Sequence, residues 1–132
     1  MMTVNWTGIL VAAFSGFVIG GLWYSPVGFG KTWQREAQLT DAQMAAGNPA
    51  KIFGLSFVLM VLAAFVFSMF LGTNPGVRFA TGAGFAAGLF WVAASFGVNY
   101  LFERKGLKLF LINGAYHTVQ FTAIGLALGL LT

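Results

Sequence analysis

Long apolar segments alternate with short charged ones along this chain. The ten charged residues form three groups, Lys31 to Lys51, Arg78 alone, and Glu103 to Lys108. Four charge-free segments remain, at residues 1–30, 52–77, 79–102 and 109–132. Each has at least 24 residues, and a helix needs about 20 apolar residues to cross a bilayer. The pattern predicts an all-α polytopic membrane protein, an antiparallel bundle of four transmembrane helices.

Helix start and stop signals refine these spans within a single transmembrane domain, residues 1–132. The expected spans are residues 4–24, 49–71, 76–102 and 107–130. Asn48-Pro49 and Asn74-Pro75-Gly76 each offer a capping side chain followed by a helix-starting proline. Because the second and third connections are short, we expect spans two, three and four to be antiparallel neighbours.

The first connection, residues 25–50, is the one long connection, and it contains an interfacial segment at residues 26–47. Apolar residues that recur every four positions here are Phe29, Trp33 and Ala37. This spacing, with charged residues opposite, favours a short helix lying in the membrane interface. Thr40 and Gln43 form a capping box for a second short helix.

Aromatic residues mark the predicted membrane boundaries, because amphipathic rings favour the headgroup level. Trp6 lies at the outer end of the first span, and Trp23 with Tyr24 lies at its inner end. We expect these three residues and Trp33 to be interface anchors.

The composition is 58% hydrophobic and 8% charged, against roughly a quarter charged in a soluble domain. Four spans use nearly all of the 132 residues, so we expect no extramembrane catalytic domain, no enzyme activity and no cofactor. The absence of cysteine excludes disulfides and thiolate metal sites. The first span ends without a cleavage-site pattern, and we expect a retained helix rather than a signal peptide.

Basic residues predict the orientation. Six of the seven lie in the first and third connections, whereas Arg78 is alone in the second. By the positive-inside rule, the connections at residues 25–50 and 103–106 are cytoplasmic and both termini lie outside. Basic residues placed there face anionic headgroups, so we expect membrane lipids, and no nucleic acid, as partners.

Glycines recur at a four-residue spacing in three of the spans. The pairs are Gly16/Gly20, Gly84/Gly88 and Gly125/Gly129. Such pairs allow close backbone approach, so we expect spans one, three and four to pack closely and span two to be more exposed to lipid. The alternative is that the pairs arise by chance in glycine-rich spans.

Two segments resemble nucleotide-binding motifs without the required context. Residues 25–32 differ from a P-loop at the first glycine position, but a membrane helix precedes them. Residues 82–87 match a dinucleotide fingerprint inside an apolar span. We therefore expect no nucleotide partner.

The fourth span carries one concentrated polar face, formed by Asn113, Tyr116, His117 and Gln120. His117 would lie near the bilayer midplane, where an unpaired polar group costs several kilocalories per mole, so the face must point inward. The third span offers a matching stripe at Ser95, Asn99 and Glu103. Antiparallel packing is predicted to bring Asn99 to the level of Asn113, with Glu103 near the headgroups.

Two interpretations of this predicted cluster remain open. Its members are Asn99, Glu103, Asn113, Tyr116, His117 and Gln120. It is either a small-ligand or proton site, since histidine titrates near neutral pH, or a hydrogen-bond network that packs helices. For Glu103 the alternative is an ion pair at headgroup level. One histidine with no deep carboxylate or thiol excludes a metal site, and we assign no catalytic residue.

Two parts of the chain are similar to a known family. They read Gly-Leu-Trp-Tyr-Ser-Pro at residues 21–26, continuing to Trp33, and Asn-Tyr-Leu-Phe-Glu-Arg at 99–104, followed by Leu-Ile-Asn-Gly-Ala-Tyr-His at 111–117. Together they resemble the bacterial four-helix integral membrane family catalogued as domain of unknown function 1761. The resemblance implies a bacterial inner-membrane protein, and it implies no activity because the family has none assigned.

Three functions follow as hypotheses, and the least favoured is an intramembrane enzyme, because only His117 is a deep titratable residue. The leading one is a homodimer or larger homo-oligomer that handles a small ligand or proton at the polar cluster, because four short spans hardly enclose a pathway alone. The alternative is a scaffold that binds a membrane partner, with the cluster serving helix packing.

Overall fold

The computed structural model describes residues 4–132, and this part of the chain contains helices and turns but no strand. Three helical stretches are long and apolar enough to cross a membrane, at Trp6–Trp23, Pro49–Leu71 and Val77–Glu103. A fourth long helix, Leu107–Leu130, has 24 residues, which corresponds to about 36 Å. It is less apolar than the others because it bears the polar face. The chain is thus a multi-pass helical membrane protein, and the predicted fold is confirmed.

The helices in chain order are α1 (Trp6–Trp23), α2 (Gly30–Glu36), α3 (Asp41–Ala46), α4 (Pro49–Leu71), α5 (Val77–Ala86), the π-helix η1 (Ala87–Ala93), α6 (Ala94–Glu103) and α7 (Leu107–Leu130). Local signals set several of their ends. The Asn48 side chain accepts from the Lys51 amide at the start of α4, as predicted. The predicted capping box of α3 is also present, with Thr40 and Gln43 bonded reciprocally.

The expectation that Asn74 caps the third span is wrong. Helix α5 begins after Gly76, and no side chain caps it. Asn74 (φ 51°) and Gly76 (φ 82°) both adopt positive φ. The chain must reverse between α4 and α5 within a few residues, and left-handed backbone at these positions makes that turn. Asn74 therefore serves the turn rather than the helix end.

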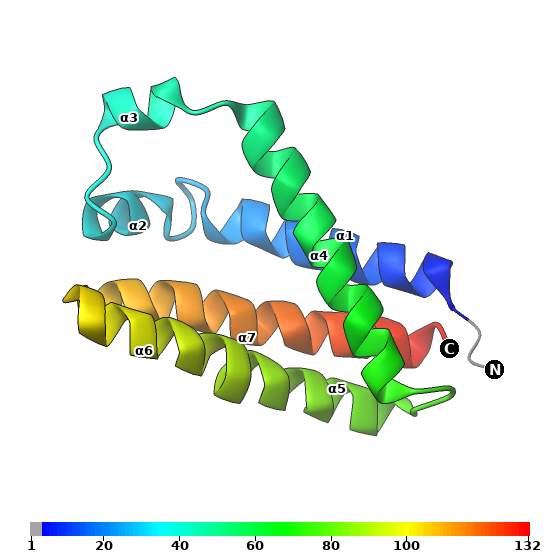
Figure 1. Cartoon of the computed structure of the whole chain (residues 1–132). Helices are drawn as coiled ribbons and strands as arrows, with labels where there is room; N and C mark the ends of the chain where they lie inside the picture. The colour runs from blue at the N-terminus through cyan, green and yellow to red at the C-terminus, as the bar shows by residue number, and fades with distance from the viewer. Residues whose placement is uncertain (1–3) are drawn as a thin grey trace.

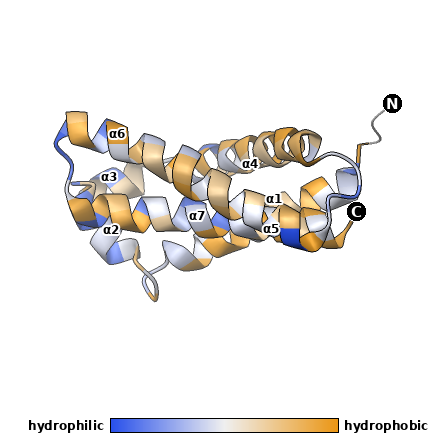
Figure 2. Ribbon diagram, turned by 90° about the horizontal axis from the view of Figure 1, so that it is seen from below, coloured by the Kyte–Doolittle hydropathy of each residue, from blue (hydrophilic) through white to orange (hydrophobic). Residues whose placement is uncertain are grey.

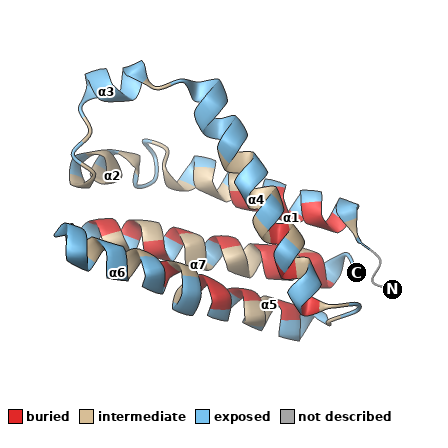
Figure 3. Cartoon of the chain, viewed as in Figure 1, coloured by how far each residue is buried: buried red, intermediate tan, exposed pale blue. Residues whose placement is uncertain are grey.

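Helix α7 occupies the centre of the bundle (Figure 1). It packs against α1 on one side and against the rod formed by α5, η1 and α6 on the other. Buried residues follow α7 and the faces turned toward it (Figure 3). Hydrophobic residues cover most of the helical surface, and hydrophilic residues gather toward the ends of the bundle (Figure 2). The least apolar long helix is thus the one most enclosed by protein.

Helix α4 crosses the bundle at a steep angle and is mostly exposed (Figures 1 and 3). It packs against α1, and its buried residues, Ala64, Phe67 and Leu71, all lie in its second half. The expected exposure of span two is confirmed. The expectation that it lies alongside span three as an antiparallel neighbour is wrong, since α4 packs against α1 instead. Its bulky side chains, with no glycine pair at a four-residue spacing, disfavour close alignment along another helix.

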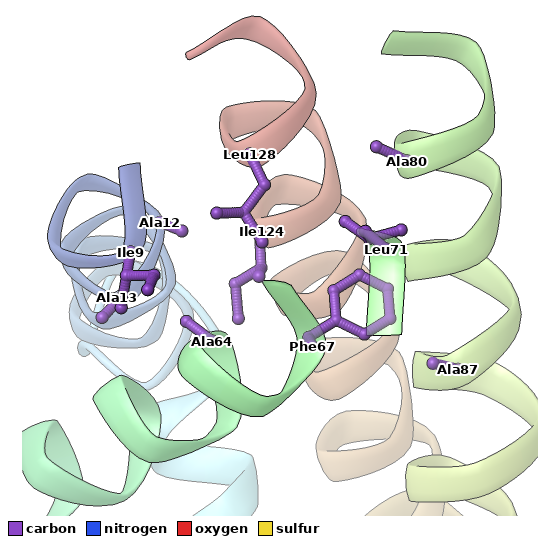
Figure 4. Close-up of a cluster of buried hydrophobic side chains, with 10 residues drawn as sticks. All are labelled: Ile9, Ala12, Ala13, Ala64, Phe67, Leu71, Ala80, Ala87, Ile124 and Leu128. Atoms are coloured by element: carbon purple, nitrogen blue, oxygen red, sulfur yellow. The ribbon is translucent and has the colours of Figure 1, made fainter. Parts of the chain in front are cut away.

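One apolar core joins the four long segments (Figure 4). Its buried side chains come from α1 (Ile9, Ala12, Ala13), α4 (Ala64, Phe67, Leu71), the rod (Ala80, Ala87) and α7 (Ile124, Leu128). Alanines on α1 and the rod bring these helices close to α7, while Phe67 packs edge-on against Phe121 at 6.0 Å between ring centroids. The core therefore holds mainly the second half of α4, while Phe53 and Phe57 of its first half pack edge-on against Phe17 of α1.

The paired glycines lie at the contacts between helices. A Cβ added to Gly84 would collide with the Phe121 carbonyl oxygen, and one added to Gly125 would collide with that of Ala80. An added Cβ would also come within 2.9 Å of a neighbouring helix at Gly16, Gly20, Gly88 and Gly129. Glycine at these positions lets α1 and the rod approach the backbone or the polar side chains of α7.

The π-helix η1 rotates the second half of the third span. In an uninterrupted α-helix, Ser95 and Asn99 would lie about 20° and 60° from Gly84 and would face α7. A π-turn inserts one extra residue and shifts the inward face by one position. Phe96 accordingly stacks on His117, and Tyr100 hydrogen-bonds to Asn113. Ser95 and Asn99 are exposed.

We predict that Gly125→Ala destabilises the bundle because the added methyl group collides with the backbone of α5. The free energy of unfolding should fall by about 1–3 kcal/mol. Unfolding in mixed detergent micelles, followed by circular dichroism, measures this loss. Gly82→Ala is the matched control, since Gly82 is exposed and an added Cβ meets nothing within 4 Å. Equal stability of both variants would contradict the close α5–α7 contact.

Candidate functional site

A group of polar and aromatic side chains surrounds the first half of α7, at the end of the bundle where α1 leads into α2. We call it the polar-aromatic cluster. Its members are Trp23, Tyr24, Phe96, Tyr100, Asn113, Tyr116, His117 and Gln120. They come from the end of α1, from α6 and from α7, so the cluster joins three segments distant in sequence.

Asn113 connects α7 to both neighbours. The Tyr24 hydroxyl donates to Asn113 Oδ1 at 2.6 Å, and Asn113 Nδ2 donates to the Tyr100 hydroxyl at 2.7 Å. One amide thus uses its acceptor toward the end of α1 and a donor toward α6. An amide is well suited to this position because it offers both kinds of group in one plane.

Two further hydrogen bonds fasten α1 along α7. Tyr116, which is 4% exposed, donates its hydroxyl proton to the Gly16 carbonyl oxygen at 3.0 Å. The Trp23 indole N–H donates to the Ile112 carbonyl oxygen at 3.0 Å. A Cβ added to Gly20 would lie only 2.8 Å from the Tyr116 hydroxyl oxygen. Glycine at position 20 therefore leaves space for the Tyr116 ring, whose hydroxyl bonds to the Gly16 carbonyl one turn earlier in α1.

His117 is held by one hydrogen bond and two rings. Its Nδ1 lies 2.7 Å from Gln120 Oε1, and because an amide oxygen accepts, Nδ1 carries the proton. The ring stacks on Phe96 at 4.9 Å between centroids, with 13° between planes. On another side Tyr116 lies 4.8 Å away. Gln120 is itself 3% exposed, so this pair sits at the buried centre of α7.

Four of the six residues predicted for the cluster come together, and two do not. Asn113, Tyr116, His117 and Gln120 share the inward side of α7. Asn99 and Glu103 are exposed on α6. The prediction that Asn99 faces Asn113 is wrong, because η1 rotates α6 so that Asn99 is exposed and the neighbouring Tyr100 bonds to Asn113 instead. Counting 100° per residue cannot anticipate a π-turn.

Glu103 makes no ion pair within the part of the chain that the structure describes. Its predicted pairing with a neighbouring basic residue is therefore not found. Glu103 and Arg104 are both exposed at the turn into α7. Water solvates charges at such a position, and an exposed pair would contribute little.

The predicted interface anchors divide into two kinds. Trp6 is 54% exposed and stacks on Phe65 of α4, which leaves it at the surface. Trp23 and Tyr24 instead turn inward to hydrogen-bond with α7, and Trp33 packs against the Tyr24 ring at 5.7 Å. Sequence reasoning missed this role, as it missed Phe96 and Tyr100. The available signal was that a partly buried tyrosine or tryptophan needs a partner for its polar atom.

The surroundings bear on what the cluster can bind. Among residues 4–132, no three His, Asp or Glu side chains gather closely enough to hold a metal ion. Two surface hollows lie elsewhere. One, of about 490 Å³, lies between α2 and α3, and the other, of about 260 Å³, lies beside α4, α5 and η1. No residue of the polar-aromatic cluster lines either hollow.

Comparison with known proteins decides the family. The model of the family described as "Protein of unknown function (DUF1761)" matches residues 7–129. The chain belongs to this family. The match covers all four long helical segments, and it includes every member of the polar-aromatic cluster. No curated protein matches the chain, and no solved structure does. Membership in DUF1761 therefore brings no assigned activity, and function has to be argued from the residues.

We predict that Asn113→Leu destabilises this DUF1761 protein, because it leaves the Tyr24 and Tyr100 hydroxyls without their shared partner. Each interhelical bond contributes about 0.6 kcal/mol on average in membrane proteins, so the loss should be about 1 kcal/mol. Unfolding in mixed micelles, at dilution that keeps the chain monomeric, measures it. Asn99→Leu is the control, since it removes an exposed amide of the same kind. A larger loss from Asn99→Leu would contradict the rotation of α6.

Proposed function

We propose that this DUF1761 protein is a non-enzymatic membrane scaffold in which the polar-aromatic cluster holds helices together. The observation that carries the proposal is that every fully buried polar side-chain atom of the cluster has a hydrogen-bond partner in the protein. Within residues 4–132, the one fully buried side-chain polar atom without a partner is Thr81 Oγ1, which belongs to α5 and lies outside the cluster. A binding or transport site would be expected to keep some buried polar atoms free for its ligand.

The geometry of the bonds supports a fastening role. The hydroxyls of Tyr24 and Tyr116, the indole of Trp23 and both ends of the Asn113 amide point across helix boundaries. In hydrocarbon, helices associate through close packing and such hydrogen bonds, since lipid supplies no hydrophobic drive between them. The glycine contacts share this task along the whole of α7: Gly20 meets Tyr116 within the cluster, and Gly125 and Gly129 meet α5 toward the other end.

We further propose an orientation in a bacterial inner membrane with both termini outside and the connections at 25–50 and 103–106 in the cytoplasm. The distribution of basic residues supports it. So does the proximity of the two connections, because a Cβ on Gly106 would lie 3.5 Å from Glu36 Oε2. Both connections therefore belong to the same end of the bundle.

As a partner for the scaffold we propose a second copy of the chain, bound through the outer face of α6. Ser95 and Asn99 are exposed there. The Ser95 hydroxyl donates to the Trp91 carbonyl oxygen, but the side-chain amide of Asn99 has no hydrogen-bond partner among residues 4–132. An amide facing lipid is costly, and amides on two copies can satisfy each other.

A second candidate function is a proton or small-ligand site at His117. One observation favours it. Within the described residues, Nδ1 of the His117 ring bonds to Gln120, whereas Nε2 has no hydrogen-bond partner. A free imidazole nitrogen inside a membrane bundle can accept a proton or a donor group of a ligand. The scaffold proposal and this one differ in what His117 does.

Reconstitution separates the two functions. If the scaffold proposal holds, proteoliposomes containing the wild type should pass protons no faster than protein-free vesicles when a pH gradient is applied. His117→Gln should then change thermal stability without changing flux. A flux in the wild type that is lost in His117→Gln, at unchanged thermal stability, would overturn the scaffold proposal in favour of the proton site.

Cysteine cross-linking tests the self-association face, and the absence of native cysteine makes the result easy to read. Ser95→Cys should form a disulfide-linked dimer on oxidation in membranes. Leu101→Cys should not, although Leu101 is 78% exposed, because it lies on another side of α6. Adding Asn99→Leu to Ser95→Cys should lower the cross-linked fraction. Cross-linking at Leu101 but not at Ser95 would exclude this face.

A further inference from the structure

The hollow between α2 and α3 contains both signs of charge at the membrane surface. It is lined by Lys31, Gln34, Arg35, Leu39, Thr40 and Asp41 and has a volume of about 490 Å³. None of these residues takes part in the polar-aromatic cluster, and helix packing does not require their charges. The hollow is therefore a separate feature of the interfacial segment.

The basic side of the hollow is formed by α2. Lys31 and Arg35 are four residues apart, so they lie on one face of this helix about one turn apart. Both are exposed, and within residues 4–132 neither lies within 4.0 Å of a carboxylate. Two free cations at this spacing suit a phosphate group, which accepts the planar guanidinium fork and the ammonium together.

The acidic side is fixed in place by an amide. Gln34 Nε2 donates to Asp41 Oδ1 at 2.8 Å and to the Leu39 carbonyl oxygen at 3.1 Å. Asp41 thus accepts a hydrogen bond from the Gln34 amide and forms no ion pair with Lys31 or Arg35, although both line the same hollow. The second oxygen of its carboxylate has no partner among residues 4–132 and is free for a ligand. Gln34 thus links α2, which carries the two cations, to the first residue of α3.

Opposite charges that share a hollow without pairing complement a zwitterion. We propose that this hollow binds the headgroup of a phospholipid that has a phosphodiester and a free primary amine. The phosphate contacts Lys31 and Arg35, and the ammonium group contacts Asp41, with the Thr40 hydroxyl beside it. A purely anionic headgroup would meet the Asp41 carboxylate, and a quaternary amine could not donate a hydrogen bond to it.

The position of the hollow favours a lipid over a soluble phosphoamine. Helix α2 begins at Gly30, seven residues after α1 ends at Trp23, and it contacts α7 near the end of the bundle. Chain this short keeps α2 at the membrane surface. Trp33 packs against Tyr24 at the end of α1, which holds the helix there. Headgroups therefore lie at the level of the hollow.

Native mass spectrometry of the full-length protein tests the proposal with lipids of equal acyl chains. The wild type should retain phosphatidylethanolamine more than phosphatidylcholine or phosphatidylglycerol. Asp41→Asn should remove the preference over phosphatidylcholine. Lys31→Gln with Arg35→Gln should lower retention of phosphatidylethanolamine by about tenfold, the effect of losing roughly one charge-assisted bond. Lys51→Gln and Lys105→Gln, basic residues outside the hollow, should change nothing.

Three results would overturn the proposal. One is equal retention of the three lipids by the wild type, and another is loss of retention in the Lys51 and Lys105 controls as large as in the double variant. The third is displacement of the lipid by soluble glycerophosphoethanolamine at equal concentration, which would make the ligand a soluble phosphoamine. Thermal unfolding of each variant accompanies the measurement, and Arg35→Lys, which keeps the charge, should retain most of the binding if the variants are folded.

Discussion

Helix α7 carries amide, imidazole and phenol groups through the depth of a bilayer, where no water satisfies them. This constraint places α7 at the centre, since each polar group on it must find a protein partner. The two halves of α7 are held by different kinds of contact. At Gly84 and Gly125 the backbones of α5 and α7 touch, and at Asn113 side chains from two neighbours converge. The other long helices are arranged around these contacts, and α4, which has no polar group to satisfy on α7, is free to cross at a steep angle.

The π-helix gives the third span two differently oriented halves. Its first half presents Gly84 and Gly88 to α7, and its second half presents Phe96 and Tyr100. Aromatic residues thereby enclose the imidazole of His117, and the amide of Asn99 is turned outward. The same local rotation thus completes the inner cluster and creates a polar stripe on the outer surface. π-turns often occur at functional positions in helices, and here the turn separates internal packing from the surface proposed for self-association.

The interfacial segment links the membrane surface to the interior. Trp23, Tyr24 and Trp33 continue the cluster from α7 into α2, so α2 is held in place by contacts that also fasten α1. The charged hollow is therefore built on a helix that packs against the bundle. A scaffold that senses or binds particular lipids needs this connection, because lipid contacts at a mobile loop would have no effect on the bundle.

The sequence by itself determined the number and approximate length of the long helical segments, because charge-free segments of this length have few other structures open to them. It also determined the local ends, as at Asn48 and Thr40, where capping depends on neighbours within one turn. It identified four inward residues on α7 because burial of polar groups in lipid allows one orientation. Tertiary structure decided their partners. Whether Asn99 or Tyr100 faces Asn113 depends on the one residue that the π-turn of η1 inserts, and η1 itself packs against α7. The periodicity of the third span does not predict the π-turn, because the turn depends on the contact between two helices.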